Sequence, residues 1–160
     1  MAFALLAVRT VLSRELAGFD RRMRSIAAND TRAPLLMTTP DVGVIVALTF
    51  ASAIDDPSRF TSSKAVGADF GLTPTSISRE TDYTGRIAKN GDESVRTALY
   101  EAAHCIICKP LKGCTALKSW AMRIAKRAGH KKATVALARK LAVIVHRMMV
   151  DGTLFMDQAA

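Results

Sequence analysis

The sequence predicts a mainly α-helical fold, and three observations carry this prediction. Apolar residues recur every three or four positions through most of the chain, as they do along one face of a helix. Capping residues precede the helices expected in the C-terminal half. Apolar residues make up 49% of the 160 residues, while Gly and Pro number only 9 and 5, so one compact domain with a packed core is expected.

The first expected element is a long helix over residues 1–29. Its apolar residues follow one another in steps of three and four, the heptad rhythm of a coiled coil; they are Leu5, Val8, Leu12, Leu16, Phe19, Met23 and Ile26. Two interpretations stay open. The helix packs on its own domain, or it forms one strand of a coiled coil that joins copies of the chain into a homo-oligomer.

A helix-hairpin-helix-like corner is expected next. A polar break at residues 29–34 precedes a short helix near Leu35, a turn that contains Gly43, and an apolar helix from Ile45 to Ile54. In such a corner the free backbone N–H groups at the start of the second helix can bind a phosphate, which makes Gly43 a candidate contact. An ordinary helical corner is the alternative.

The middle of the chain is expected to be an irregular loop. A short helix over residues 62–70 ends at Gly71, and from Leu72 to Asn90 no helical period survives among dense Thr, Ser, Pro and Gly. Long loops inside compact domains are often functional.

Three helices complete the chain. They run from Asp92 to about residue 108, from Thr115 to about 128, and, with Thr134 in the first turn, to about 150. Because the connections are short, we expect antiparallel neighbours in a three-helix basic bundle. The expected domains are a coiled-coil-like helix over 1–29, a main domain over 30–155 and a tail over 156–160.

The net charge of +9 is concentrated in one part of the chain. Residues 102–150 contain eleven Lys and Arg and no acidic residue, which favours a polyanionic partner, nucleic acid before a membrane. Candidate contacts are Lys126, Arg127, Lys131, Lys132, Arg139 and Lys140. No apolar run is long enough to span a membrane, and neither a signal peptide nor a disulfide framework among the three cysteines is expected, so a cytoplasmic protein is predicted.

The end of the loop is a second candidate for phosphate binding. Arg86 and Lys89 lie with two glycines directly before a helix N-terminus, where backbone N–H groups and the helix dipole favour an anion. An ordinary turn and helix cap is the alternative. Upstream hydroxyls include Ser76 and Ser78, but the residue pattern alone selects none of them as a nucleophile.

No metal site is expected. His104, Cys105, Cys108 and Cys114 do not form the two ligand pairs of a structural zinc site, and the cysteines are interpreted as core thiols. The acidic residues are scattered and do not predict a two-metal site. His130 and His146 fall in basic helical segments and are expected at the surface.

Several blocks in the loop and the helix after it have a recognisable order: Leu72–Pro74, Ser78, Thr84–Asp92, Val95–Thr97 and Leu99–Ala103. Further blocks are Pro40–Gly43, Leu117–Trp120, Ala138–Ala142, His146–Met148 and Val150–Thr153. Together they resemble the C-terminal domain of insertion-sequence transposases of the one-ten and eleven-eleven families, over roughly residues 9–155.

The resemblance implies a DNA recombinase guided by a structured RNA. Proteins of this type join an acidic, metal-binding N-terminal domain through a coiled coil to a C-terminal domain that contributes a serine. By position Ser78 matches that serine, which would attack a DNA phosphate, and Arg79, Arg86 and Lys89 would contact nucleic acid beside it. Arg79 stands where a glycine is usual in these families. Asp41 replaces the usual first glycine of the helix-hairpin-helix-like corner.

The acidic domain has no counterpart in this sequence, so the Mg²⁺ that the family reaction implies would be held elsewhere and no cofactor is expected on this chain. Three hypotheses follow. The chain is the serine-bearing part of a transposase, inactive by itself; or a DNA- or RNA-binding helical module without chemistry; or a homodimerising remnant.

Overall fold

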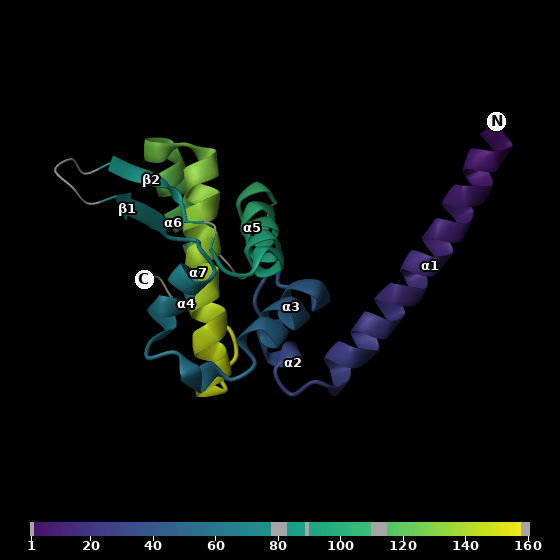
Figure 1. Ribbon diagram of the computed structural model, residues 1–160, viewed down its shortest axis with the longest axis horizontal. Helices are drawn as coiled ribbons and strands as arrows, with labels where there is room; N and C mark the ends of the chain where they lie inside the picture. The colour runs from purple at the N-terminus through teal and green to yellow at the C-terminus, as the bar shows by residue number, and fades with distance from the viewer. Residues whose placement is uncertain (1, 78–82, 89, 110–114, 158–160) are drawn as a thin grey trace.

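A computed structural model describes residues 2–77, 83–88, 90–109 and 115–157 (Figure 1). The elements in chain order are α1 (Ala2–Asn29), α2 (Ala33–Leu36), α3 (Val44–Ile54), the 3₁₀ turn η1 (Pro57–Arg59), α4 (Ser63–Asp69), β1 (Pro74–Ile77), β2 (Tyr83–Ile87), α5 (Glu93–Cys108), α6 (Thr115–Ala128) and α7 (His130–Asp151). The prediction of a mainly helical fold with a long N-terminal helix is confirmed.

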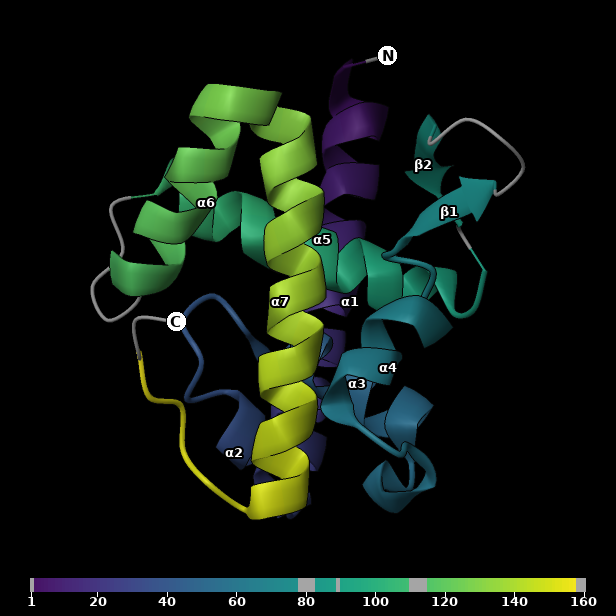
Figure 2. The same ribbon diagram turned by 90° about the vertical axis from the view of Figure 1, so that its left-hand side faces the viewer.

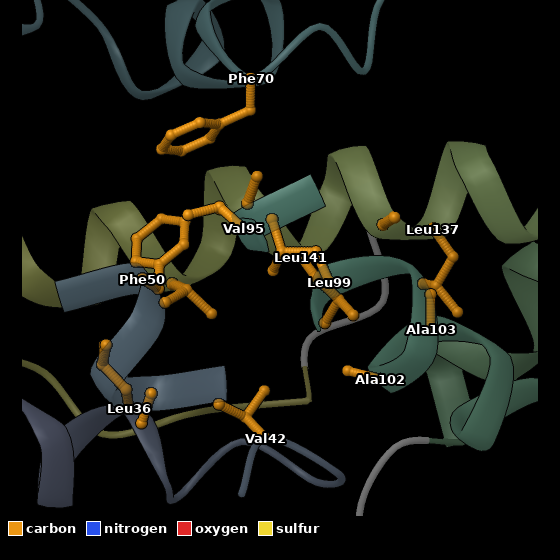
Figure 3. Close-up of a cluster of buried hydrophobic side chains, with 14 of the residues drawn as sticks. Leu36, Val42, Phe50, Phe70, Val95, Leu99, Ala102, Ala103, Leu137 and Leu141 are labelled. Carbon is orange, nitrogen blue, oxygen red and sulfur yellow. The ribbon is translucent and has the colours of Figure 1, made fainter. Parts of the chain in front are cut away.

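Helix α7 forms the centre of the domain, and α4, α5 and α6 pack against it (Figures 1 and 2). Leu141 of α7 lies beside Leu99 of α5 in the core, and both side chains are fully buried (Figure 3). Phe50 of α3 meets Phe70 at an edge-to-face angle of 60°, with ring centroids 5.8 Å apart. Apolar side chains from all seven described α-helices therefore contribute to one shared core.

The predicted helix limits hold for α5 and α6. Asp92 caps α5, because its carboxylate accepts hydrogen bonds from the backbone N–H groups of Ser94, at 2.7 Å, and Val95, at 3.3 Å. Helix α6 runs over the predicted Thr115–Ala128. One face of α5 is buried throughout, and its apolar residues follow one another in steps of three and four; they are Val95, Leu99, Ala102 and Ile106.

The C-terminal bundle differs from the prediction in two respects. Helix α7 begins at His130, one turn before the predicted start, because Gly129 alone turns the chain with a φ of 89°. In addition, α5 crosses behind α7 instead of lying antiparallel to it (Figure 2). The reason is that α5 packs on both α3 and α7 and so connects these two helices.

The segment predicted as an irregular loop contains an antiparallel β-hairpin. Strands β1 and β2 pair with Ser76 opposite Thr84 and Ile77 opposite Tyr83, with an irregularity between Pro74 and Ser76. The irregular-loop prediction is therefore wrong for these residues. β-Branched and aromatic residues favour the strands, and Pro74 stands at the start of β1, where a missing N–H is tolerated.

The corner between α2 and α3 consists of a short helix, a turn and a longer apolar helix, and its helix-hairpin-helix interpretation stays a prediction. Just before α2, the carboxylate of Asp30 accepts hydrogen bonds from the backbone N–H groups of Arg32 and Ala33, both at 2.7 Å. The hydrogen bond from Ala33 is the main cause that lowers the pKa of Asp30, ahead of the hydrogen bond and the charge of Arg32. Phosphate binding at this corner stays a prediction.

Helix α1 projects away from the domain and touches it only through its C-terminal part (Figure 1). Ala27 is its buried residue, while Leu12, Leu16 and Phe19 are more than half exposed. The coiled-coil interpretation of this helix stays a prediction. No helix in the described part of the chain is long and apolar enough to cross a membrane.

Candidate nucleic-acid interface

Four basic side chains surround the corner between α6 and α7. Lys126 and Arg127 lie in the last turn of α6, and Lys131 and Lys132 in the first turn of α7, with Gly129 as the only residue between the helices. All four side chains are exposed. Within the described residues none of them pairs with a carboxylate, so their charge is available to an anionic partner.

Two other predicted contacts, Arg139 and Lys140, are partly engaged within the domain. The Lys140 Nζ atom lies 4.6 Å from the centroid of the Trp120 ring, a cation–π contact between α7 and α6. The aliphatic part of Arg139 lies on α4, so close to Gly67 that a Cβ atom there would stand 2.9 Å from the Arg139 Cγ atom. These two residues serve packing as well as charge.

The hairpin that contains Arg86 lies at the same end of the domain as the α6–α7 corner (Figures 1 and 2). Its base is held by Arg96 from the first turn of α5. The Arg96 Nη1 atom donates to the carbonyl oxygens of Phe70 and Asn90, each at 3.2 Å. A backbone hydrogen bond of 3.0 Å from Ala88 N–H to the Thr73 carbonyl closes the base further.

Gly91 completes this anchor. Its φ of 79° lies in the left-handed region, and a Cβ atom at this position would stand 2.0 Å from the Asp69 carbonyl oxygen. Sequence reasoning gave Arg96 no role, and it interpreted Gly91 as part of a phosphate-binding segment or of an ordinary turn. Asn-Gly-Asp signals a turn, but no local signal shows that the backbone of α4 lies against it.

The predicted serine and its neighbours are placed only in part. Ser78, Arg79 and Lys89 lie outside the described residues. Arg86 belongs to β2. The proposed chemistry at Ser78 and the three basic contacts around it therefore remain predictions.

Gly43 is the N-cap residue of α3 and is exposed. It lines an open groove between α1, α3 and α5 together with Asp41, which has a φ of 60°. The Asp41 carboxylate lies 3.8 Å from the Lys109 Nζ atom and is largely buried. A phosphate bound at Gly43 would therefore lie in the same groove as the negative charge of Asp41.

His146 is buried, contrary to the expected surface position. Its Nε2 atom lies 3.2 Å from the Pro57 carbonyl oxygen, which can only accept, so Nε2 carries the proton and donates. Nδ1 then accepts from the Ser63 hydroxyl at 3.0 Å. Burial lowers the pKa of His146, against the opposing effect of the hydrogen bond to Pro57, so the ring is a neutral link between α7, η1 and α4.

Among the described residues no three carboxylates come together as ligands for a metal ion. Where the Mg²⁺ of the family reaction is held stays a prediction.

Comparisons with known proteins agree on one group. Residues 33–117 match the family model described as transposase IS116/IS110/IS902 family. The transposase for insertion sequence element IS1328 of Yersinia enterocolitica is 29% identical over 90% of this chain and 43% of its own length. A putative transposase y4pF/y4sB of Sinorhizobium fredii is 30% identical over 88% of this chain and 37% of its own.

The transposase for insertion sequence element IS1111A of Coxiella burnetii is also similar, with 26% identity over 84% of this chain and 37% of its own length. The chain thus spans about two fifths of the length of the curated relatives that it matches. The family model covers the hairpin with its Arg96 anchor and the corner at Gly43, whereas the α6–α7 corner lies beyond it.

Proposed function

Since the chain belongs to the IS116/IS110/IS902 family of transposases, we propose that it acts in DNA transposition as a nucleic-acid-binding part of a transposase that also contributes Ser78 to strand exchange. One observation carries the binding half of the proposal: four exposed bases without carboxylate partners surround the α6–α7 corner, at the end of the domain where the hairpin also lies. Such a group matches the closely spaced phosphates of DNA.

The spacing of these bases supports the proposal. Lys126, Arg127, Lys131 and Lys132 lie on two helices that meet at a single glycine, so their charges converge on one corner. Bases in the last turn of α6 also stabilise its C-terminus, which explains two of the charges by helix energetics alone. Lys131 and Lys132 stand at the opposite kind of terminus, where a positive charge opposes the helix dipole, and binding gives a reason for them there.

A salt titration of DNA binding tests the proposal. The variant with Lys126, Arg127, Lys131 and Lys132 all replaced by Gln is expected to bind DNA more weakly. The slope of log K against log salt should also become shallower by roughly 0.9 for each phosphate that the variant no longer neutralises. Fluorescence anisotropy with a labelled duplex measures both quantities.

The matched control removes four positive charges from α1, at Arg9, Arg14, Arg21 and Arg22, all of which are exposed. This control should keep most of the affinity and the slope. Equally weakened binding in the two variants would show that net charge alone drives binding and would refute an interface at the α6–α7 corner.

The catalytic half of the proposal assigns to Ser78 the attack on a DNA phosphate, a covalent step in which its hydroxyl oxygen replaces a DNA oxygen on the phosphorus. Mg²⁺ would be held by an acidic domain supplied separately. With that domain present, Ser78→Ala should abolish the covalent protein–DNA adduct while DNA affinity stays within about twofold, as measured by denaturing gels and by anisotropy. Ser76→Ala is the control, and an unchanged adduct in Ser78→Ala would refute the role.

A structured guide RNA is proposed as a second ligand of the same basic corner. Lys and Arg side chains bind RNA phosphates as they bind those of DNA, so competition between a structured RNA and the labelled duplex is expected. Failure of RNA to displace DNA would place the RNA elsewhere.

A further inference from the structure

Three potential metal ligands converge where the C-terminal end of α5 meets the N-terminal end of α7. They are His104 and Cys108 of α5 and His130, the first residue of α7. One ligand atom from each lies within 4.8 Å of the other two, and all three side chains are exposed. The spacing of Cys-x-x-Cys and histidines along the sequence did not indicate this group, because 22 residues separate Cys108 from His130.

The distances fit a tetrahedral ion. The Cys108 Sγ atom lies 3.6 Å from His104 Nε2 and 3.9 Å from His130 Nε2. In a tetrahedral zinc site with Zn–S near 2.3 Å and Zn–N near 2.05 Å, a sulfur and a nitrogen ligand are about 3.6 Å apart. The two sulfur–nitrogen edges are therefore close to the length that a bound ion requires.

Helix geometry explains why two of the ligands face the same way. His104 and Cys108 are four residues apart on α5, so their side chains are neighbours on one face. The third ligand, His130, lies close to them because Gly129 turns the chain directly into α7. The His104 and His130 rings stand almost perpendicular, at 88°, with centroids 5.6 Å apart, which lets a nitrogen of each approach the thiol.

We propose that His104, Cys108 and His130 bind a zinc-type transition-metal ion, with water in the fourth position. One thiolate and two imidazoles form a soft nitrogen and sulfur ligand set, which favours Zn²⁺ or Co²⁺ over oxygen-seeking Mg²⁺. The ion would clip the end of α5 to the start of α7 and so fix the turn that carries Lys131 and Lys132. This assignment is independent of the proposed function, since it needs neither DNA nor Ser78.

The test is a titration of the reduced, tag-free full chain with Co²⁺. Binding at Cys108 should produce the thiolate-to-cobalt charge-transfer band together with the intense visible bands of four-coordinate cobalt, and Zn²⁺ should abolish both by displacement. The midpoint of thermal unfolding should rise with Zn²⁺ and stay unchanged with Mg²⁺.

Single-ligand variants identify the site. Cys108→Ser should lose the charge-transfer band, whereas the double variant Cys105→Ser/Cys114→Ser, which keeps Cys108 as its single thiol, should retain it. His130→Asn leaves all thiols in place and should weaken Co²⁺ binding at least about tenfold. Absence of the band in the parent chain, its loss in the Cys105/Cys114 variant, or unchanged affinity in His130→Asn would each overturn the proposal.

Discussion

His146 shows how one buried side chain connects three elements. Its two ring nitrogens are both occupied, by the Pro57 carbonyl and by the Ser63 hydroxyl, and its ring meets Phe60 edge-on with centroids 5.2 Å apart. A second proton would place a positive charge in an environment that is 1% exposed. The neutral ring is therefore part of the native packing, which makes the domain sensitive to acid.

Stability should consequently depend on pH through His146. Burial lowers its native pKa below the ordinary value of 6.5, so between these two values the unfolded chain binds the proton more readily. The free energy of unfolding is then complete above about pH 6.5, falls as the pH drops below it, and levels off below the native pKa, with a slope of at most about 1.4 kcal/mol per pH unit. Urea unfolding at several pH values measures it.

His146→Gln is the control for this dependence, because an amide can still donate to the Pro57 carbonyl but does not titrate. The exposed His104 and His130 remain in this variant. A slope that persists unchanged between pH 5 and 7 would assign the effect to other groups.

At the scale of elements, the end of α4 and the start of α5 are packed backbone against backbone. The contact at Gly91 leaves no space for a side chain, and the guanidinium of Arg96 lies beside it. This junction sets the direction in which the β1–β2 hairpin leaves the domain.

Gly91→Ala should therefore lower the free energy of unfolding by about 2–4 kcal/mol, from the positive φ and from the clash with the Asp69 carbonyl. Gly152→Ala, at the residue after α7, separates these causes. Gly152 has a left-handed φ of 65° but nothing within 4 Å, so its cost should be about 1 kcal/mol. Denaturant unfolding measures both variants, and equal costs would mean that the Asp69 carbonyl moves aside.

The elements that the sequence predicted correctly are those with local signals. Asp92 caps α5 through its own neighbours, and the stripe from Val95 to Ile106 follows from helical periodicity. The hairpin was missed because Pro74 and Gly85 interrupt the apolar and polar alternation of its strands. The site residues Arg96, His130 and His146 were missed because their partners are distant in sequence, and only the packing of helices brings them together.

At the scale of the whole molecule, the projecting α1 and the compact domain differ in how many apolar side chains they expose. The domain packs apolar side chains into one core and exposes others such as Ile45 and Val150, whereas α1 exposes a whole row of them: Leu5, Val8, Leu12, Leu16, Phe19 and Ile26. Contiguous exposed apolar surface of this kind is a mark of interaction sites. A second copy of α1 matches it in length and heptad spacing, so we propose that the chain forms homo-oligomers through this helix.

Replacing Leu12 and Leu16 by Glu should convert such an oligomer to a folded monomer, since both side chains are more than half exposed on α1 and take no part in the core of the domain. Arg14→Gln/Arg21→Gln is the control, because it changes the net charge by the same amount outside the heptad seam. Sedimentation velocity over a range of concentrations measures the mass. A monomeric parent chain, or a seam variant that still associates, would contradict the proposal.

The anchor formed by Arg96 affects how the domain tolerates changes in the length of the hairpin. One nitrogen holds the carbonyls of Phe70 and Asn90, so these two oxygens cannot lie farther apart than twice 3.2 Å. Because Arg96 holds the two ends of the segment together, the distance between the ends does not depend on the length of the segment. Lengthening the segment therefore adds little to the entropy cost of closing the loop. A longer or shorter segment in place of β1 and β2 is therefore expected to leave the stability of the helical core unchanged, as denaturant unfolding of such a variant would measure.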